Sequence, residues 1–176
     1  MVDFNTAPNS NRSPGLHFAA TLIYERTEEP NIVEVGTAWN PDNAADGWST
    51  LFFAWLAKTY GGNVYSIDIE SNHIAASKKI THTYPDCVKY ILGDGEAILK
   101  KFERPIHLLY LDGKQNMGNS VKEFGAARQW LCDNSIVMID DSDSKGRKLI
   151  PILEKNGWII LFQEKHHAEQ TILCKP

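Results

Sequence analysis

The sequence predicts an α/β fold, a doubly wound Rossmann-like sheet of about seven strands that is mostly parallel and has an antiparallel C-terminal strand. From residue 31 onward, short apolar runs alternate with longer helix-like segments, which is the pattern of βαβ units. Several runs are almost continuously Val, Ile, Leu and Tyr, as expected for strands covered by helices on both faces. The last two runs, GWIILFQ and QTILC, flank the short segment EKHHAE, a spacing that suits a hairpin.

Two helices are predicted in the first half of the chain. Residues 49–60 are apolar almost all round and are followed by Gly61, which indicates a buried helix with a glycine stop. Residues 71–84 begin with Ser71, a good capping residue, and stop before Pro85. The strands that precede the final hairpin are expected at 31–35, 63–67, 88–92, 106–111 and 135–139.

Two further helices are predicted in the second half. Val121, Phe124, Arg128 and Leu131 mark one face of a helix that precedes the fifth strand. In the segment LIPILEKNG, Pro151 is expected in the first turn of a helix or at a kink.

The whole chain, residues 1–176, is expected to form a single domain, because its length and 43% apolar content suit one hydrophobic core. Residues 1–14 are rich in Asn, Ser and Pro, and we expect them to be flexible. The start of the chain lacks the basic and then apolar organisation of a secretion signal. No apolar run approaches the ~18 residues of a membrane span.

Charge and cysteine content indicate the class of partner. The net charge is -4, and acidic and basic residues are mixed along the chain, so neither nucleic acid nor an anionic membrane is an expected partner. A small molecule is expected instead. Cys87, Cys132 and Cys174 have no spacing typical of a disulfide framework or a zinc site, which fits a reducing cytoplasm.

Acidic or glycine residues follow each of the first five predicted strands. Parallel strands place their carboxyl ends along one edge of the sheet, where ligands bind in open α/β folds. Each acid alone is equally explained as a helix cap or turn residue. Together they would repel one another unless a cation or hydroxyl donors accompany them, which predicts a cofactor site. The positions are Gly36, Asp68, Gly93-Asp94-Gly95, Asp112-Gly113 and Asp140-Asp141.

The segment EVGTAWNPDNAADGWST, residues 34–50, is interpreted as a divided cofactor loop. A ribose-binding acid is expected about 20 residues past the glycine turn, a spacing that Asp68 satisfies relative to Gly47 rather than Gly36. Residues 40–46 would then be an insertion, which we expect to form part of the substrate wall. Ser49 would stand at the positive N-terminus of the following helix, suited to a carboxylate or phosphate.

These motifs resemble the class I S-adenosylmethionine (SAM)-dependent methyltransferases, in particular the small metal-dependent O-methyltransferases related to catechol and caffeoyl-coenzyme A enzymes. The resemblance runs from about residue 31 to the C-terminus and rests on the order and spacing of EVGT...GWST, YSIDIE, LGDGEAIL, HLLYLDG, IVMIDD and the closing strands. It implies methyl transfer from SAM to a hydroxyl of a small molecule. Small members of this family often pair, which leaves a homodimer open.

Carried onto this sequence, the resemblance implies contacts along the whole cofactor. The methionine part would meet the divided loop, the ribose would be held by the acid after the second strand, and the adenine would lie against the residues that follow the second and third strands. The cofactor-binding residues implied are Glu34, Gly36, Thr37, Gly47, Ser49, Asp68, Ile69, Asp94, Gly95 and Asp112.

The resemblance also implies a divalent cation, Mg²⁺, Mn²⁺ or Ca²⁺, bound by Asp112, Asp140 and Asp141. Carboxylates are the hard oxygen ligands that these ions prefer. Asp141 departs from the family, which usually has Asn there, and Asp140-Asp141 are also explained as a cap on the next segment. Lys114 is the candidate general base, although it stands one position earlier than the lysine of catechol-type members.

Other classes remain open. A receiver or phosphatase fold also gathers aspartates at strand ends, but its acidic signature belongs at the first strand. An NAD-dependent oxidoreductase would use Asp68 but needs a compact GxGxxG loop. A noncatalytic SAM-binding or assembly protein of the same fold is the strongest alternative. His166 and His167, in the predicted hairpin, face the same edge of the sheet and are candidates for a substrate role. Exposed loop histidines are, however, usually only solvated.

Overall fold

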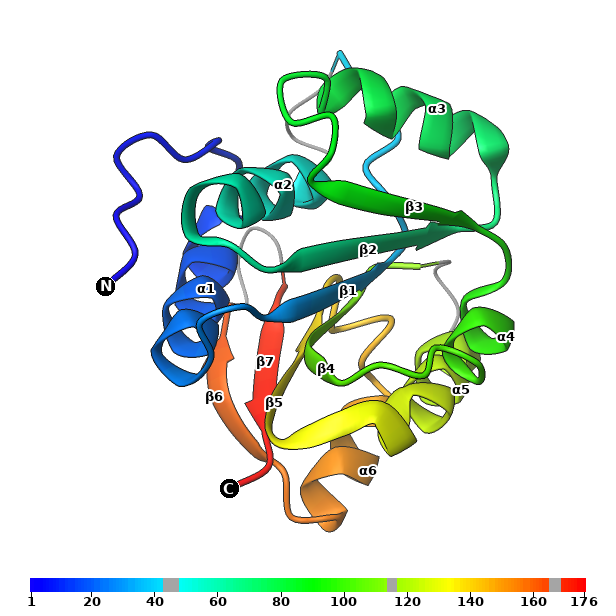
Figure 1. Ribbon diagram of the computed structural model, residues 1–176. Helices are drawn as coiled ribbons and strands as arrows, with labels where there is room; N and C mark the ends of the chain where they lie inside the picture. The colour runs from blue at the N-terminus through cyan, green and yellow to red at the C-terminus, as the bar shows by residue number, and fades with distance from the viewer. Residues whose placement is uncertain (43–47, 114–116, 165–168) are drawn as a thin grey trace.

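The computed structural model describes residues 1–42, 48–113, 117–164 and 169–176. Its centre is a single seven-stranded sheet (Figure 1). The strands are β1 Asn31–Val35, β2 Asn63–Asp68, β3 Val88–Leu92, β4 Ile106–Leu111, β5 Leu131–Ile139, β6 Ile159–Gln163 and β7 Thr171–Cys174.

The strand order is β3-β2-β1-β4-β5-β7-β6. The first five strands run parallel to one another, whereas β7 lies antiparallel between β5 and β6. This confirms the predicted doubly wound, mostly parallel α/β fold and its closing hairpin. The order in which strands are added to the sheet reverses between β1 and β4: β2 and β3 lie on one side of β1, and β4 and β5 lie on the other. Ligands bind at such a switch point in open α/β folds.

Helices cover both faces of the sheet (Figure 1). On one face, α1 and α2 pack on Ile32, Leu108 and Ile136. On the other, α4, α5 and α6 pack on Val33, Leu109 and their neighbours. Alternate residues of each strand therefore enter two different hydrophobic layers, which is why the strands are apolar throughout. The helices are α1 Ser13–Arg26, α2 Ser49–Tyr60, α3 Ser71–Ile80, α4 Gly95–Leu99, α5 Met117–Ala127 and α6 Leu149–Lys155.

Two helix boundaries differ from the sequence-based prediction. The helix expected at 71–84 ends at Ile80, and Ser71 is its first helical residue rather than its cap. Leu131, expected on a helical face, begins β5, because α5 ends at Ala127 and a short 3-10 turn follows. Leu131 pairs with Ile106 in the sheet, so tertiary pairing overrides the helical periodicity there.

The N-terminal residues contact the α1/α2 face. The ring of Phe4 stacks on that of His17, with centroids 4.0 Å apart, and Val2 is buried. The backbone N–H of Asp3 donates to the hydroxyl of Tyr60 at 2.8 Å. These contacts involve residues 1–14, for which the sequence predicts flexibility, and they lead the chain into α1, which packs on one face of the sheet. None of the helices over the described ranges is both long and apolar enough for a membrane crossing.

Candidate functional site

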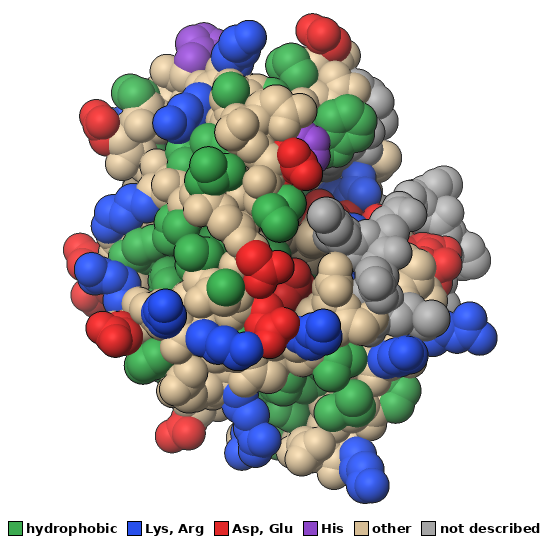
Figure 2. All heavy atoms as spheres, turned by 90° about the vertical axis from the view of Figure 1, so that its right-hand side faces the viewer, with side chains coloured by type: hydrophobic (Ala, Val, Ile, Leu, Met, Phe, Trp, Pro, Cys, Tyr) green, Lys and Arg blue, Asp and Glu red, His purple; other side chains and the backbone are tan. Residues whose placement is uncertain are grey.

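A pocket of about 500 Å³ lies at the carboxyl ends of the parallel strands. Figure 2 views the molecule from the side toward which β2 and β3 point, and acidic side chains gather near the middle of this face. The strand ends provide most of the wall, so the structure brings together the edge that the sequence predicts. The residues from the strand ends are Val35–Thr37, Ile67–Glu70, Gly93–Gly95, Asp112–Gly113 and Asp141.

Gly36 makes the turn that opens this pocket. Its φ is +89°, a left-handed conformation that residues with a Cβ rarely adopt. A Cβ there would collide with the carbonyl oxygen of Asp112 and lie 2.9 Å from the backbone nitrogen of Gly113. Glycine therefore allows the chain leaving β1 to pass directly against the chain leaving β4.

Asp68, at the end of β2, is held rigidly at the pocket. Its Oδ1 accepts from the backbone N–H of Glu70 at 2.8 Å, and its Oδ2 accepts from that of Thr37 at 3.1 Å. The Nδ1 of His73 lies 3.3 Å from the same Oδ2. The carboxylate is 9% exposed and lines the pocket. A carboxylate has about four acceptor sites, so it retains capacity for a ligand.

Glu34 and Ser49 do not line the pocket. The Glu34 side chain is fully buried on the α2 side of β1, and its oxygens accept from the hydroxyls of Ser49 at 2.5 Å, Thr50 at 2.7 Å and Ser66 at 2.6 Å. Burial raises the pKa of Glu34 to about 7, and the three hydroxyl donors oppose this rise. These two residues join α2 to β1 and β2 beneath the site, and their predicted contacts with a cofactor stay a prediction.

The loop after β3 combines a structural and a wall role. The Oδ1 of Asp94 accepts from the backbone N–H of Ala97 at 3.0 Å, so Asp94 caps α4 while also lining the pocket. A Cβ on Gly95 would lie 2.7 Å from a Val35 methyl carbon. Glycine at position 95 therefore allows the chain after β3 to approach the Val35 side chain closely. Ile69 is 46% exposed on the same wall.

Glu123, on α5, is a pocket residue that the sequence reasoning missed. It is 8% exposed, and its Oε1 lies 3.1 Å from the position of a Cβ on Gly95 and 3.2 Å from that of a Cβ on Gly113. Burial raises the pKa of Glu123 to about 7, with Asp94 adding to the rise and Lys145 opposing it. The sequence predicts an apolar helix face that includes its neighbour Phe124. The sequence does not indicate whether a glutamate beside that face is buried or exposed to solvent.

Replacing Glu123 by glutamine should change how stability depends on pH. The folded-state pKa of about 7 lies above the ordinary 4.5, so the carboxyl contributes stability below pH 4.5 that is lost as pH rises through 7. The free energy of unfolding of the wild type minus that of Glu123→Gln should fall by up to roughly 3 kcal/mol across this window. Urea unfolding at a series of pH values measures it. Glu154→Gln, on the exposed side of α6, is the matched control and should leave stability nearly unchanged.

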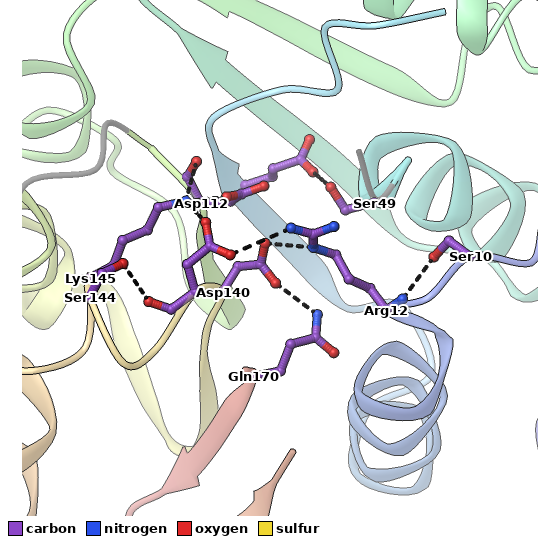
Figure 3. A network of polar contacts seen from close by, with 10 residues as sticks. Ser10, Arg12, Ser49, Asp112, Asp140, Ser144, Lys145 and Gln170 are labelled. Carbon is purple, nitrogen blue, oxygen red and sulfur yellow. Dashed lines mark hydrogen bonds and ion pairs between the residues drawn. The ribbon is translucent and has the colours of Figure 1, made fainter. Parts of the chain in front are cut away.

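The three acids predicted to bind a metal do come together. One oxygen from each of Asp112, Asp140 and Asp141 lies within 4.8 Å of the others. Two basic side chains enter this cluster, and Figure 3 shows them arriving from opposite sides. The Nζ of Lys145 lies 2.5 Å from Asp112 Oδ1 and 3.1 Å from Asp141 Oδ2. The Nε of Arg12 lies 2.6 Å from Asp140 Oδ2.

Asp140 is enclosed rather than presented to the pocket. It is 0% exposed, and its second oxygen, Oδ1, accepts from the Gln170 side-chain amide at 3.0 Å. Burial raises the pKa of Asp140, and Arg12 opposes this rise. Burial and Asp140 together raise the pKa of Asp112, which Lys145 opposes. The cluster is thus one coupled group of carboxylates with its own basic partners.

A tight turn after β5 directs Lys145 into the cluster. The backbone N–H groups of Ser144 and Lys145 donate to the carbonyl of Asp141 at 3.0 and 2.9 Å, and Asp141 has a φ of +45°. The hydroxyl of Ser120 on α5 donates to the carbonyl of Lys145 at 2.6 Å. Burial by itself lowers the pKa of Lys145, but the carboxylates of Asp112 and Asp141 outweigh it and the pKa is raised. Lys145 is therefore a charged ammonium.

Some predicted residues lie outside the described ranges. These are Gly47, the candidate base Lys114, the histidines at 166 and 167, and residues 43–46 of the proposed insertion. Of the described residues beside that insertion, Trp39 lines the pocket and its ring lies 5.9 Å from that of His73.

Comparisons with known proteins agree with this architecture. Residues 44–142, more than half of the chain, match a family described as a methyltransferase domain. A comparison with curated proteins finds no match.

Similar solved structures share the fold at low sequence identity. CalS11, a TDP-rhamnose 3'-O-methyltransferase in calicheamicin biosynthesis, is 14% identical, with a TM-score of 0.71 over 92% of this chain and 77% of that one. The O-methyltransferase TomG from Streptomyces achromogenes, in complex with SAM, is 16% identical, with a TM-score of 0.67 over 91% and 78%. An rRNA methylase from Streptococcus thermophilus is 15% identical, with a TM-score of 0.66 over 91% and 95%.

Proposed function

We propose that this chain, which belongs to the methyltransferase domain family, transfers a methyl group from SAM to a hydroxyl of a small molecule. The observation that carries the proposal is the pocket at the strand ends, with the Asp68 carboxylate fixed at the end of β2. That is the position from which an acid accepts hydrogen bonds from two ribose hydroxyls in nucleoside-binding α/β folds.

The remaining wall residues suit the other parts of this cofactor. The turn at Gly36 and Thr37 would hold the methionine end, next to the acids after β4 and β5. Asp94 and Glu123, on either side of Gly95, are acceptors suited to the exocyclic amino group of adenine, and Ile69 offers an apolar surface for the ring. TomG, a solved structure of the same fold, contains SAM, which supports this choice of cofactor.

When bound, SAM supplies an electrophilic methyl group on a sulfonium. The acceptor oxygen would form a bond to that methyl carbon as the carbon–sulfur bond breaks, and the hydroxyl proton would pass to a base. Holding the two reactants in line is the main contribution of the protein. Lys114 stays the proposed base, and residues 40–46 stay the proposed acceptor wall.

The net charge of -4 and the acidic pocket favour a small, uncharged or cationic acceptor over nucleic acid. CalS11 and TomG are both O-methyltransferases, which supports a hydroxyl as the methylated group. A noncatalytic SAM-binding protein would use the same wall. The divalent ion implied by the resemblance is not kept in this proposal, because Lys145 and Arg12 already pair with the carboxylates that would bind it.

The proposal is tested by calorimetric titration with S-adenosylhomocysteine (SAH), the product form of the cofactor. Wild-type protein should bind one SAH, and Asp68→Asn should bind it at least about tenfold more weakly, because a charge-assisted hydrogen bond to the ribose is lost. The amide oxygen of asparagine can still accept from one of the two loop N–H groups, so the fold should survive. Asp86→Asn, an exposed acid outside the pocket, is the control and should bind like the wild type. Unaltered affinity in Asp68→Asn would remove the ribose assignment.

A further inference from the structure

The ammonium of Lys145 occupies a position between carboxylates that the family resemblance would give to a divalent ion. Its Nζ donates to Asp112 Oδ1 at 2.5 Å and to the Asp112 backbone carbonyl at 3.3 Å, and it pairs with Asp141 Oδ2 at 3.1 Å. The ammonium therefore has two hydrogen-bond acceptors on Asp112 and an ion-pair partner on Asp141. The side chain is 6% exposed and still lines the pocket.

The guanidinium of Arg12 closes the other side of the cluster. It pairs with Asp140 Oδ2 through Nε at 2.6 Å and lies 3.6 Å from Asp141 Oδ1 through a terminal nitrogen. With Gln170 on the second oxygen of Asp140, that carboxylate has a protein donor on each oxygen. Figure 3 shows the result: the two cations and the amide surround the acids from three directions.

A divalent ion does not fit this donor set. One oxygen of each acid already faces Lys145 or Arg12, and an ion bound among the three acids would stand a few ångströms from an ammonium, where like charges repel. Mg²⁺ and Ca²⁺ also need six or more oxygen ligands around one point. Here the acids of the cluster are turned toward fixed cations, and Asp140 is closed off from the pocket.

We propose that Lys145, supported by Arg12, is the built-in cation of this site and replaces the divalent metal of the related metal-dependent methyltransferases. Lys145 is then a positioning residue: it fixes Asp112 and Asp141 at the acceptor end of the pocket and supplies positive charge beside the oxygen that becomes methylated. The inference rests on the proposed function for that chemical meaning, while the ion arrangement itself does not depend on it.

Lys145 is unsuited to act as the general base. Its ammonium already donates two hydrogen bonds to Asp112 and pairs with Asp141, and proton uptake would require it first to lose a proton inside this ring of oxygens. A base for the acceptor hydroxyl therefore has to come from another residue.

The proposal is tested with Mn²⁺ as a paramagnetic probe. The electron paramagnetic resonance signal of free Mn²⁺ should stay undiminished when excess wild-type protein is added, with or without SAH. Lys145→Met keeps the length of the side chain and removes its charge, which leaves the acids with one cation fewer; it should bind Mn²⁺ and reduce the free signal. Lys148→Met, an exposed neighbour, should behave like the wild type.

Two results would overturn the proposal. One is stoichiometric Mn²⁺ binding by the wild type that Asp112→Asn abolishes, which would mean that the metal displaces the ammonium. The other is a folded Lys145→Met protein that binds no Mn²⁺, which would mean that the acids are not a cation site. If Lys145→Met does not fold, the wild-type and Asp112→Asn titrations still decide. Failure of SAH to bind would instead remove the proposed function and leave these ion-binding results standing.

Discussion

Replacing Gly36 by alanine is expected to destabilise the protein and to abolish SAH binding. The φ of +89° alone costs an alanine about 1–3 kcal/mol. The new methyl group would also collide with the carbonyl of Asp112, which belongs to backbone and cannot rotate away. Relief requires the chain segments after β1 and β4 to separate, and both line the pocket. Urea unfolding and SAH calorimetry measure the two effects.

Gly125→Ala is the matched control for this substitution. Gly125 lies in α5, and a Cβ there would meet nothing within 4 Å. Alanine is favoured over glycine inside a helix, so this variant should be more stable than the wild type by roughly 0.5–1 kcal/mol and should bind SAH normally. Normal stability and binding in Gly36→Ala would contradict the role assigned to the turn.

Replacing Arg12 by alanine should cost about 3–5 kcal/mol of unfolding free energy at neutral pH, because it leaves the Asp140 carboxylate buried without its cation. The loss should shrink as pH falls. Without Arg12 the folded-state pKa of Asp140 rises further, and protonation of the carboxyl then removes the unpaired charge. Urea unfolding at two pH values measures both the loss and its pH dependence.

Arg26→Ala separates this effect from the loss of any arginine at an end of α1. Arg26 is exposed and donates one hydrogen bond to the carbonyl of Asn134, so its removal should change stability by only a few tenths of a kcal/mol. In the double variant Arg12→Ala, Asp140→Asn, the asparagine carries no charge to bury and should recover part of the lost stability. Equal effects of Arg12→Ala and Arg26→Ala would show that the Arg12–Asp140 pair does not stabilise the fold.

The sheet was predictable because its information is local. Continuous apolar runs such as IHLLYL identify strands buried on both faces, and the residues that follow them fall at the carboxyl edge in any parallel sheet. Gly36, Asp68 and Asp94 could be assigned to the pocket on that basis, and the structure places all three on its wall. Errors arose where tertiary pairing decides, as at Leu131, which pairs with Ile106 instead of extending a helix.

The partners of the acids were not predictable in the same way. Arg12 and Asp140 are separated by 128 residues, and no pattern links an arginine in a polar N-terminal segment to a strand end. Lys145 offered a weak signal, since it follows Asp141 by four residues in DSDSKGRK, the spacing of a helical ion pair. The orientation of the Glu34 side chain toward α2 was also not predictable, because a strand buried on both faces does not reveal which layer receives a polar side chain.

The decisive measurement is calorimetric titration of the wild-type protein with SAH, once with Mg²⁺ and once with EDTA. We expect one SAH per chain and the same dissociation constant in both buffers, because the cofactor wall and the fixed cations of Lys145 and Arg12 belong to the protein itself. No heat in either buffer would contradict a cofactor site at the strand ends, and binding that EDTA abolishes would contradict the internal cation.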